Sequence, residues 1–176
     1  VLQLSRVRDA STTEEVYMEV IRGKTAMLFE ASTHSAAALA EATDEQREAL
    51  RTFGDHLGVA FQLVDDLLDY KGDSQTLGKN VGDDLAEGKP TLPLIYTMRE
   101  GTAEQAALVR QAIQKGGLED LEQIRVAVEE SGALKYTAEL ARDYVKRAIA
   151  CLEVLPASEY RDALVELSEF AVARTH

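Results

Sequence analysis

The chain has 176 residues, of which 45% are hydrophobic, and a formal net charge of −12. The hydrophobic share excludes a disordered chain, and the length is sufficient for one domain with a buried core. The negative charge excludes a general nucleic-acid binder, because the phosphates would be repelled. With a single cysteine, Cys151, the chain forms no internal disulfide, which is typical of a reducing compartment and predicts a cytoplasmic protein.

No hydrophobic run approaches the roughly 18 residues of a membrane-spanning helix. The N-terminal stretch carries Arg6, Arg8 and Asp9, and it lacks the hydrophobic centre of a signal peptide. The sequence opens without an initiator Met, so we expect it to be a fragment of a longer protein.

Helices are expected throughout, because the sequence has only three prolines and lacks the alternation typical of strands. Three pairs of Thr with Glu or Gln three residues later match the capping box that marks the start of a helix. They are Thr12–Glu15, Thr43–Gln46 and Thr102–Gln105. We predict that the first helix runs to about Ala40 and the second to about Tyr70.

Prolines and glycines predict the remaining boundaries. Pro90 and Pro93 suit the first turn of a helix that runs to about Arg99. Later helices should be separated by three breaks. They are Gly116-Gly117, Ser131-Gly132 and Pro156. Because the sequence shows no repeat and no linker, it predicts one all-α domain over residues 1–176.

The stretch FQLVDDLLD (61–69) places acids inside a hydrophobic run. On a helix, four polar side chains would share an arc of about 100°, opposite a hydrophobic face. They are Gln62, Asp65, Asp66 and Asp69. Such a stripe is ordinarily a solvated surface, but Asp is a poor helix former and the acids repel one another. The pattern therefore favours a site for Mg²⁺, which commonly takes one or two carboxylates and completes its shell with water and substrate phosphate.

The longest stretch without helical periodicity, Lys71 to Lys89, follows these acids directly, and its lysines suit the same phosphates. A P-loop is excluded because five residues, not four, separate Gly82 from Gly88. An EF-hand loop that began at Asp69 would have the wrong spacing. The histidines lack partners at metal-ligand spacing, and the tyrosines, Tyr17 among them, are scattered and indicate no site.

Three motifs, in this order, resemble those of the all-trans polyprenyl diphosphate synthases. They are Lys24-Thr25, FQLVDDLLD (61–69) and the segment from Gly78 to Pro93. The resemblance covers the whole chain and is greatest to the bacterial members that make octaprenyl diphosphate for quinone side chains. It implies the all-α helical isoprenoid synthase fold around a central cavity. It also implies a prenyltransferase that uses Mg²⁺ to add isopentenyl diphosphate head-to-tail to an allylic, farnesyl-type diphosphate.

The resemblance also implies roles for individual residues. Asp65 would bind Mg²⁺, Asp69 would assist directly or through water, and Asp66 would hold the neighbouring network. The allylic diphosphate would be bound by Lys24, Thr25, Gln62, Lys79 and, with the weakest case, Lys89. Three of these would also act in catalysis, by charge or by oxygen dipoles near the developing carbocation. They are Lys24, Thr25 and Gln62.

Members of that family carry two facing aspartate-rich motifs, whereas this chain has only one Asp-Asp-x-x-Asp, at Asp65–Asp69. We therefore expect the C-terminal half of a longer synthase, inactive alone, from a family that usually forms homodimers. Two alternatives stay open. One is a terpene cyclase or squalene-type synthase, which shares the fold and the Mg²⁺ chemistry. The other is a non-catalytic subunit of a heteromeric prenyltransferase.

Overall fold

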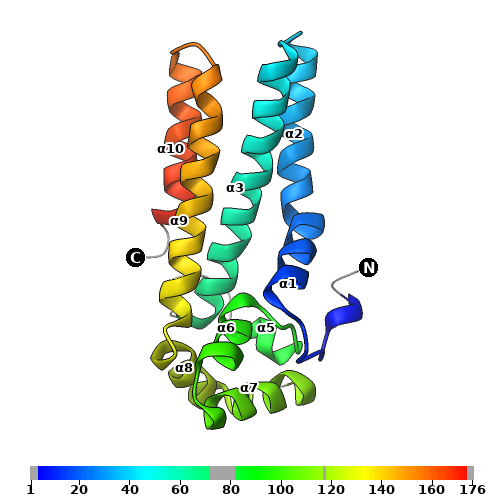
Figure 1. Cartoon of the computed structure of the whole chain (residues 1–176), viewed down its shortest axis with the longest axis vertical. Helices are drawn as coiled ribbons and strands as arrows, with labels where there is room; N and C mark the ends of the chain where they lie inside the picture. The colour runs from blue at the N-terminus through cyan, green and yellow to red at the C-terminus, as the bar shows by residue number, and fades with distance from the viewer. Residues whose placement is uncertain (1–3, 72–81, 117, 174–176) are drawn as a thin grey trace. The chain divides into compact units, whose positions relative to one another are not determined.

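The computed structural model describes residues 4–71, 82–116 and 118–173. Every regular element in these ranges is a helix, which confirms the predicted all-α class (Figure 1). In chain order they are η1 (Leu4–Arg6), α1 (Glu14–Ile21), η2 (Arg22–Ala26), α2 (Met27–Leu39), α3 (Asp44–Lys71), α5 (Asp83–Ala86), α6 (Leu92–Glu100), α7 (Ala103–Lys115), α8 (Leu121–Glu130), α9 (Ala133–Cys151), η3 (Leu152–Val154) and α10 (Glu159–Ala173). Among these described helices, none combines the length and the hydrophobicity needed to cross a membrane.

The contacts within the chain divide it into two compact units. The first unit comprises Val1–Val20 and Asp65–Thr137, and the second comprises Ile21–Val64 and Ala138–His176. Two long helices, α3 and α9, belong partly to each unit, because the unit boundaries fall inside them. The single domain expected over residues 1–176 stays a prediction.

The first unit is built around a hydrophobic cluster in which α6 packs against α7 and α8. Its buried members are Tyr70, Leu85, Leu94, Val109, Ala112, Ile113, Ile124, Val128 and Ala133. Complete burial of one such aliphatic side chain contributes about 1.5–3 kcal/mol. Because Tyr70 directly follows the acids of α3, this cluster anchors the end of the helix that carries them.

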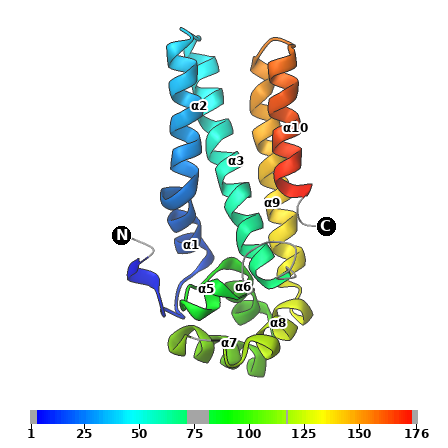
Figure 2. The ribbon, with the colours of Figure 1, turned by 180° about the vertical axis from the view of Figure 1, so that it is seen from behind.

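The second unit packs α2 beside α3, and α9 beside α10, as both views of the ribbon show (Figures 1 and 2). Its core cluster of buried residues is Phe53, Leu57, Ala148, Leu152 and Ala171. Two glycines of α3 permit a close approach of the neighbouring helix. A Cβ atom at Gly58 would lie 2.5 Å from the Cα of Ala26, and one at Gly54 would lie 2.6 Å from the carbonyl oxygen of Phe29. Any larger residue at either position would push η2 and α2 away.

Two of the three predicted capping boxes are confirmed. At the start of α3, the Gln46 N–H donates to Thr43 Oγ1 at 3.2 Å and the Thr43 N–H donates to Gln46 Oε1 at 3.1 Å. Thr102 and Gln105 make the same reciprocal pair at the start of α7. The end of α3 at Lys71 also agrees with the predicted end near Tyr70.

The predicted box at Thr12 and Glu15 is wrong by one residue. Helix α1 begins at Glu14, and the residue before it, Thr13, accepts the N–H of Val16 at 3.4 Å. The hydroxyl of Thr12 donates instead to the carbonyl oxygen of Asp9 at 2.9 Å. Two adjacent threonines offer the same cap chemistry, so the local pattern did not distinguish them. The helix expected as far as Ala40 is present, because residues 14–39 are helical without a break, but its middle turn is the π-helix η2 between α1 and α2.

The predicted breaks are largely confirmed. Pro93 lies in the first turn of α6, but Pro90 lies outside that helix, because Thr91 is the N-cap residue. Gly116 follows α7 and Gly132 follows the end of α8, with φ angles of 69° and 81°. Glycine adopts these positive values without the steric cost of a side chain.

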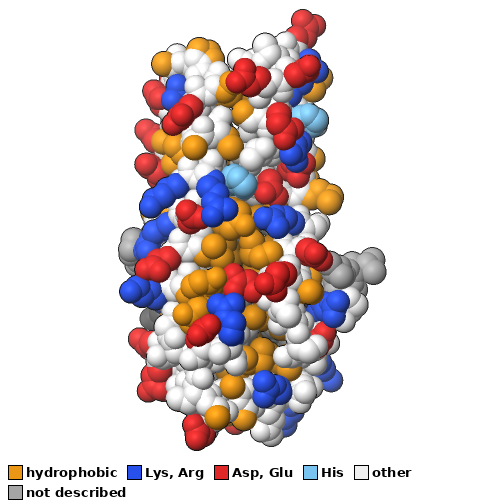
Figure 3. Space-filling view, viewed as in Figure 1, with side chains coloured by type: hydrophobic (Ala, Val, Ile, Leu, Met, Phe, Trp, Pro, Cys, Tyr) orange, Lys and Arg blue, Asp and Glu red, His pale blue; other side chains and the backbone are white. Residues whose placement is uncertain are grey.

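Charged side chains of both signs are interspersed over the face drawn in Figure 3. In the second unit, for example, Arg51 lies 2.8 Å from Glu30 and 2.6 Å from Glu48. Partly exposed pairs of this kind contribute at most about 1 kcal/mol each, which is less than the complete burial of one aliphatic side chain.

Candidate functional site

The predicted acids lie on the last turns of α3, in the first unit. Asp66 is buried, with 3% of its surface exposed, whereas Asp65 and Asp69 are partly exposed. The helix continues through this stretch to Lys71, although neighbouring acids repel one another. It does so because the interleaved hydrophobic side chain of Leu67 is buried.

Asp66 is held by a tyrosine from α1. The Tyr17 hydroxyl donates to Asp66 Oδ2 at 2.6 Å, and both side chains are buried. This distance is typical of an O–H···O⁻ bond to an ionised acceptor. Burial, together with the charge of Asp66, raises the pKa of Tyr17 well above its ordinary value. The hydroxyl therefore keeps its proton at neutral pH and is the donor of the bond.

Helix α1 is attached to the rest of the first unit through Glu14. The carboxylate of Glu14 accepts from Arg99 Nη1 at 2.8 Å and from the Tyr136 hydroxyl at 2.7 Å. The Arg99 guanidinium also lies over the rings of Tyr96 and Tyr136, 5.1 and 5.7 Å from their centroids. These contacts, one turn before Tyr17, fix α1 without the help of Asp66.

Asp69 joins the end of α3 to the start of α5. Its Oδ1 accepts the Asp83 N–H at 3.1 Å, and its Oδ2 accepts the Asp84 N–H at 3.2 Å. Burial raises the pKa of Asp69 to about 6, and the charge of Asp84 adds to this rise, while the two backbone N–H groups oppose it. A cation beside these carboxylates would relieve their repulsion.

Lys89 is paired with two carboxylates. Its Nζ lies 3.1 Å from Asp84 Oδ1 and 2.9 Å from Glu87 Oε2. Burial lowers the pKa of Lys89, but its hydrogen bonds to Glu87 and Asp84 outweigh burial and raise the pKa overall. A diphosphate would have to compete with both carboxylates for this cation. The other predicted lysine of this stretch, Lys79, lies outside the described residues.

In the second unit, Lys24 and Thr25 lie on the π-helical turn η2 (Arg22–Ala26). Such π turns inside longer helical segments are frequent at functional sites. Lys24 is exposed, and the Thr25 hydroxyl donates to Gln62 Oε1 of α3 at 2.7 Å. The structure thus brings together Thr25 and Gln62, two of the three residues to which the resemblance assigns catalysis.

The residues that the structure describes form no complete metal cage, since they include no group of three or more His, Cys, Asp or Glu side chains placed to hold an ion. The donor set nevertheless fits Mg²⁺. Carboxylate oxygens are hard ligands, and Mg²⁺ commonly needs only one or two of them when substrate phosphate and water supply the rest. The partly exposed Asp65 and the crowded Asp69 meet that requirement.

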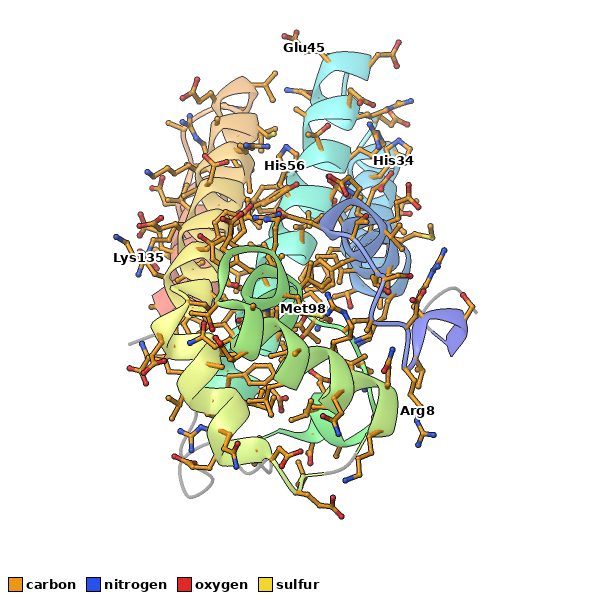
Figure 4. All side chains as sticks on the ribbon, turned by 60° about the horizontal axis from the view of Figure 1, so that its bottom comes forward. Arg8, His34, Glu45, His56, Met98 and Lys135 are labelled. Atoms are coloured by element: carbon orange, nitrogen blue, oxygen red, sulfur yellow. The ribbon has the colours of Figure 1, made fainter. Side chains whose placement is uncertain are left out.

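The two described histidines lie on different helices, His34 on α2 and His56 on α3 (Figure 4). His56 Nδ1 lies 3.3 Å from Asp55 Oδ2. Burial lowers the pKa of His56, the Asp55 carboxylate opposes this effect, and the charges of Arg147 and Arg22 reinforce it. Asp55, Arg22 and Arg147 all belong to the second unit, as His56 does. These contacts therefore add no metal ligand to the acids of α3.

Two features of the site were not found from the sequence. Tyr17 is 49 residues from Asp66 in the chain, and no local spacing connects them. The attachment of Asp69 to Asp83 and Asp84 likewise depends on the return of the chain after a segment without periodicity. One indication in the sequence places Tyr17 near the site, which is that it shares a predicted helix with Lys24.

The family model described as Polyprenyl synthetase matches residues 1–131. The octaprenyl diphosphate synthase of Haemophilus influenzae is 49% identical over 177 residues, which cover 100% of this chain and 54% of the relative. The all-trans-nonaprenyl-diphosphate synthase (geranyl-diphosphate specific) of Rhodobacter capsulatus is 51% identical over 174 residues, or 99% of this chain and 53% of the relative. The chain thus spans about half the length of the curated relatives that it matches.

Solved structures show the same likeness. The polyprenyl synthase of Caulobacter crescentus, complexed with calcium and isoprenyl diphosphate, is 44% identical with a TM-score of 0.92, over 99% of this chain and 54% of that one. A decaprenyl diphosphate synthase from Rhodobacter capsulatus is 39% identical with a TM-score of 0.91, over 99% of this chain and 55% of that one. These matches confirm the helical isoprenoid synthase fold, and the chain belongs to the polyprenyl synthetase family.

Proposed function

We propose that the protein carrying this chain is a trans-prenyltransferase, which condenses isopentenyl diphosphate with an allylic, farnesyl-type diphosphate into a long all-trans polyprenyl diphosphate. The observation that carries the proposal is the acid motif of α3, Asp65–Asp69, in a chain 49% identical over its whole length to a protein named octaprenyl diphosphate synthase. Relatives named for octaprenyl and nonaprenyl products support the reaction class.

The metal in this proposal is Mg²⁺, supported by the carboxylate donors of α3 and by the calcium named with the Caulobacter crescentus structure. Asp65 and Asp69 hold it, and Asp66 supports the network around them. When bound, Mg²⁺ supplies charge that stabilises the departing diphosphate. The negative charges of Asp69 and Asp84 repel one another, and a cation bound at Asp69 would relieve that repulsion.

The remaining residues act on the allylic substrate. Lys24 and Lys79 bind its diphosphate, and Lys89 assists once it is released from Asp84 and Glu87. Thr25 and Gln62 lie close to the reacting carbons. The Thr25 hydroxyl uses its proton in the bond to Gln62. Its oxygen lone pairs then serve to stabilise a developing carbocation.

The product, the assembly and the location are finer parts of the same proposal. We assign an octaprenyl product for quinone side chains because of the likeness to octaprenyl diphosphate synthases, although a relative of 51% identity is named for a nonaprenyl product. The proposal of a homodimer rests on the family resemblance. The proposal of a cytoplasmic location rests on the single cysteine of the chain.

The test is a product analysis with the full-length protein. It is incubated with Mg²⁺, labelled isopentenyl diphosphate and farnesyl diphosphate, and the products are dephosphorylated and sized by chromatography. All-trans chains with a maximum at octaprenyl would support the whole proposal, and another chain length would contradict only the product. Conversion of the allylic diphosphate alone into a hydrocarbon would indicate a cyclase. Activity only after addition of a second polypeptide would indicate a non-catalytic subunit.

A further inference from the structure

The carboxylate of Asp66 is separated from solvent and accepts a hydrogen bond from a tyrosine hydroxyl. Asp66 and Tyr17 are each 3% exposed, and the 2.6 Å bond between them is a buried contact that joins α1 to the acid stretch of α3. A phenol has one proton to donate, and here it is directed to Oδ2 of Asp66. A bond of this length to a carboxylate also limits the rotation of that carboxylate.

The position of Tyr17 is set by contacts other than Asp66. Glu14, one turn earlier on α1, is bound by Arg99 at 2.8 Å and by Tyr136 at 2.7 Å. Arg99 belongs to α6 and Tyr136 to α9, so two further helices of the first unit hold α1. Contacts that do not involve Asp66 therefore hold the helix that carries Tyr17.

We propose that Tyr17 is a positioning residue for the metal site, acting through the Asp66 carboxylate. The inference rests on the proposed function, in which Asp65 and Asp69 hold Mg²⁺ and Asp66 supports the network around them. Mg²⁺ tolerates little departure from octahedral geometry, so its carboxylates must be correctly oriented before it binds. Hydrogen-bonding partners of metal-site residues fix that orientation, and their loss typically weakens metal binding by about 10- to 100-fold.

The variant that isolates the hydroxyl is Tyr17→Phe, because it keeps the buried ring and removes one oxygen. A matched control is Tyr136→Phe. It also removes a phenol hydroxyl bound to a carboxylate, at 2.7 Å, but that carboxylate belongs to Glu14, which keeps its bond to Arg99. The two variants lose bonds of the same chemistry, and only one of these bonds ends at the acids of α3.

The measurement is Mn²⁺ binding by electron paramagnetic resonance, with the full-length protein and inorganic diphosphate. Tyr17→Phe should weaken binding about 10- to 100-fold, and Tyr136→Phe should leave it unchanged. In the Asp66→Asn background, Tyr17→Phe should produce no further loss. High Mg²⁺ should restore the turnover of Tyr17→Phe. Replacement of Tyr17 by 4-aminophenylalanine, a weaker donor at the same place, should give intermediate Mn²⁺ binding.

Equal Mn²⁺ binding by Tyr17→Phe and Tyr136→Phe would overturn the inference. If Asp66→Asn weakens Mn²⁺ binding and Tyr17→Phe does not, Tyr17 alone loses its role and the proposed function stands. If neither Asp65→Asn nor Asp66→Asn changes Mn²⁺ binding, the metal role and the Tyr17 role both fail. Should Tyr17→Phe not fold, the 4-aminophenylalanine variant is compared with the wild-type protein, and unchanged Mn²⁺ binding overturns the inference.

Discussion

The close approach of η2 to α3 makes Gly58→Ala the most informative single substitution for stability. The added Cβ would lie 2.5 Å from Ala26 Cα and 3.2 Å from Phe29 Cβ, whereas ordinary contacts begin at 3.4 Å. Because the nearest atom is backbone, η2 has to move by about 0.9 Å. Overpacking of this kind costs about 1–3 kcal/mol, and the better helix propensity of Ala offsets about 0.5–1 kcal/mol of that cost.

The middle of these two ranges leaves a net loss of about 1 kcal/mol for Gly58→Ala, which lowers the unfolding temperature by roughly 2–4 °C in a chain of about 150–250 residues and by less in a longer one. The matched control is Gly23→Ala in η2, where an added Cβ meets nothing within 4 Å. It should leave the unfolding temperature unchanged or raise it. Thermal unfolding of the full-length protein is followed by circular dichroism. Equal unfolding temperatures for the two variants would refute the argument from the close approach.

Four further predictions concern the metal site, the allylic substrate, the fragment and pH. Asp65→Ala should remove most of the turnover and weaken its dependence on Mg²⁺, and a rate and a Mg²⁺ response equal to those of the wild-type protein would contradict the metal role. Lys79→Ala should weaken the binding of the allylic diphosphate by roughly 1.5–3 kcal/mol, and that of isopentenyl diphosphate by less, as measured from the two KM values. Equal losses would indicate an effect on folding or on the shared cavity. The 176-residue chain alone should be inactive in prenyl transfer and should self-associate in light scattering, and an active monomer would contradict this. Because burial lowers the pKa of His56 in the folded protein, the unfolded chain takes up the proton first, so stability should fall as the pH drops below about 6.5. His56→Gln should make this decline shallower, and an unchanged pH profile would show that other groups control it.

The amino-acid sequence by itself determines the local chemistry of the chain. The caps of α3 and α7 depend on side chains only three residues from the backbone groups that they bind, so the sequence pattern is sufficient to find them. The same holds for the acid stripe, because helical geometry alone places Asp65, Asp66 and Asp69 on neighbouring turns. The error at Thr12 marks the limit of such patterns, since an adjacent Thr offers an equivalent cap.

Tertiary packing decided what those patterns leave open. The donor that Asp66 receives is 49 residues away in the chain, and Asp69 binds backbone N–H groups of α5, whose position depends on how the first unit folds. The π-helical turn that carries Lys24 and Thr25 interrupts a pattern that reads as one continuous helix. Helix propensity depends on residues that are close in the sequence. The contacts above join distant segments, which come together only when their hydrophobic faces are buried in the folded chain. A local sequence pattern therefore does not predict them.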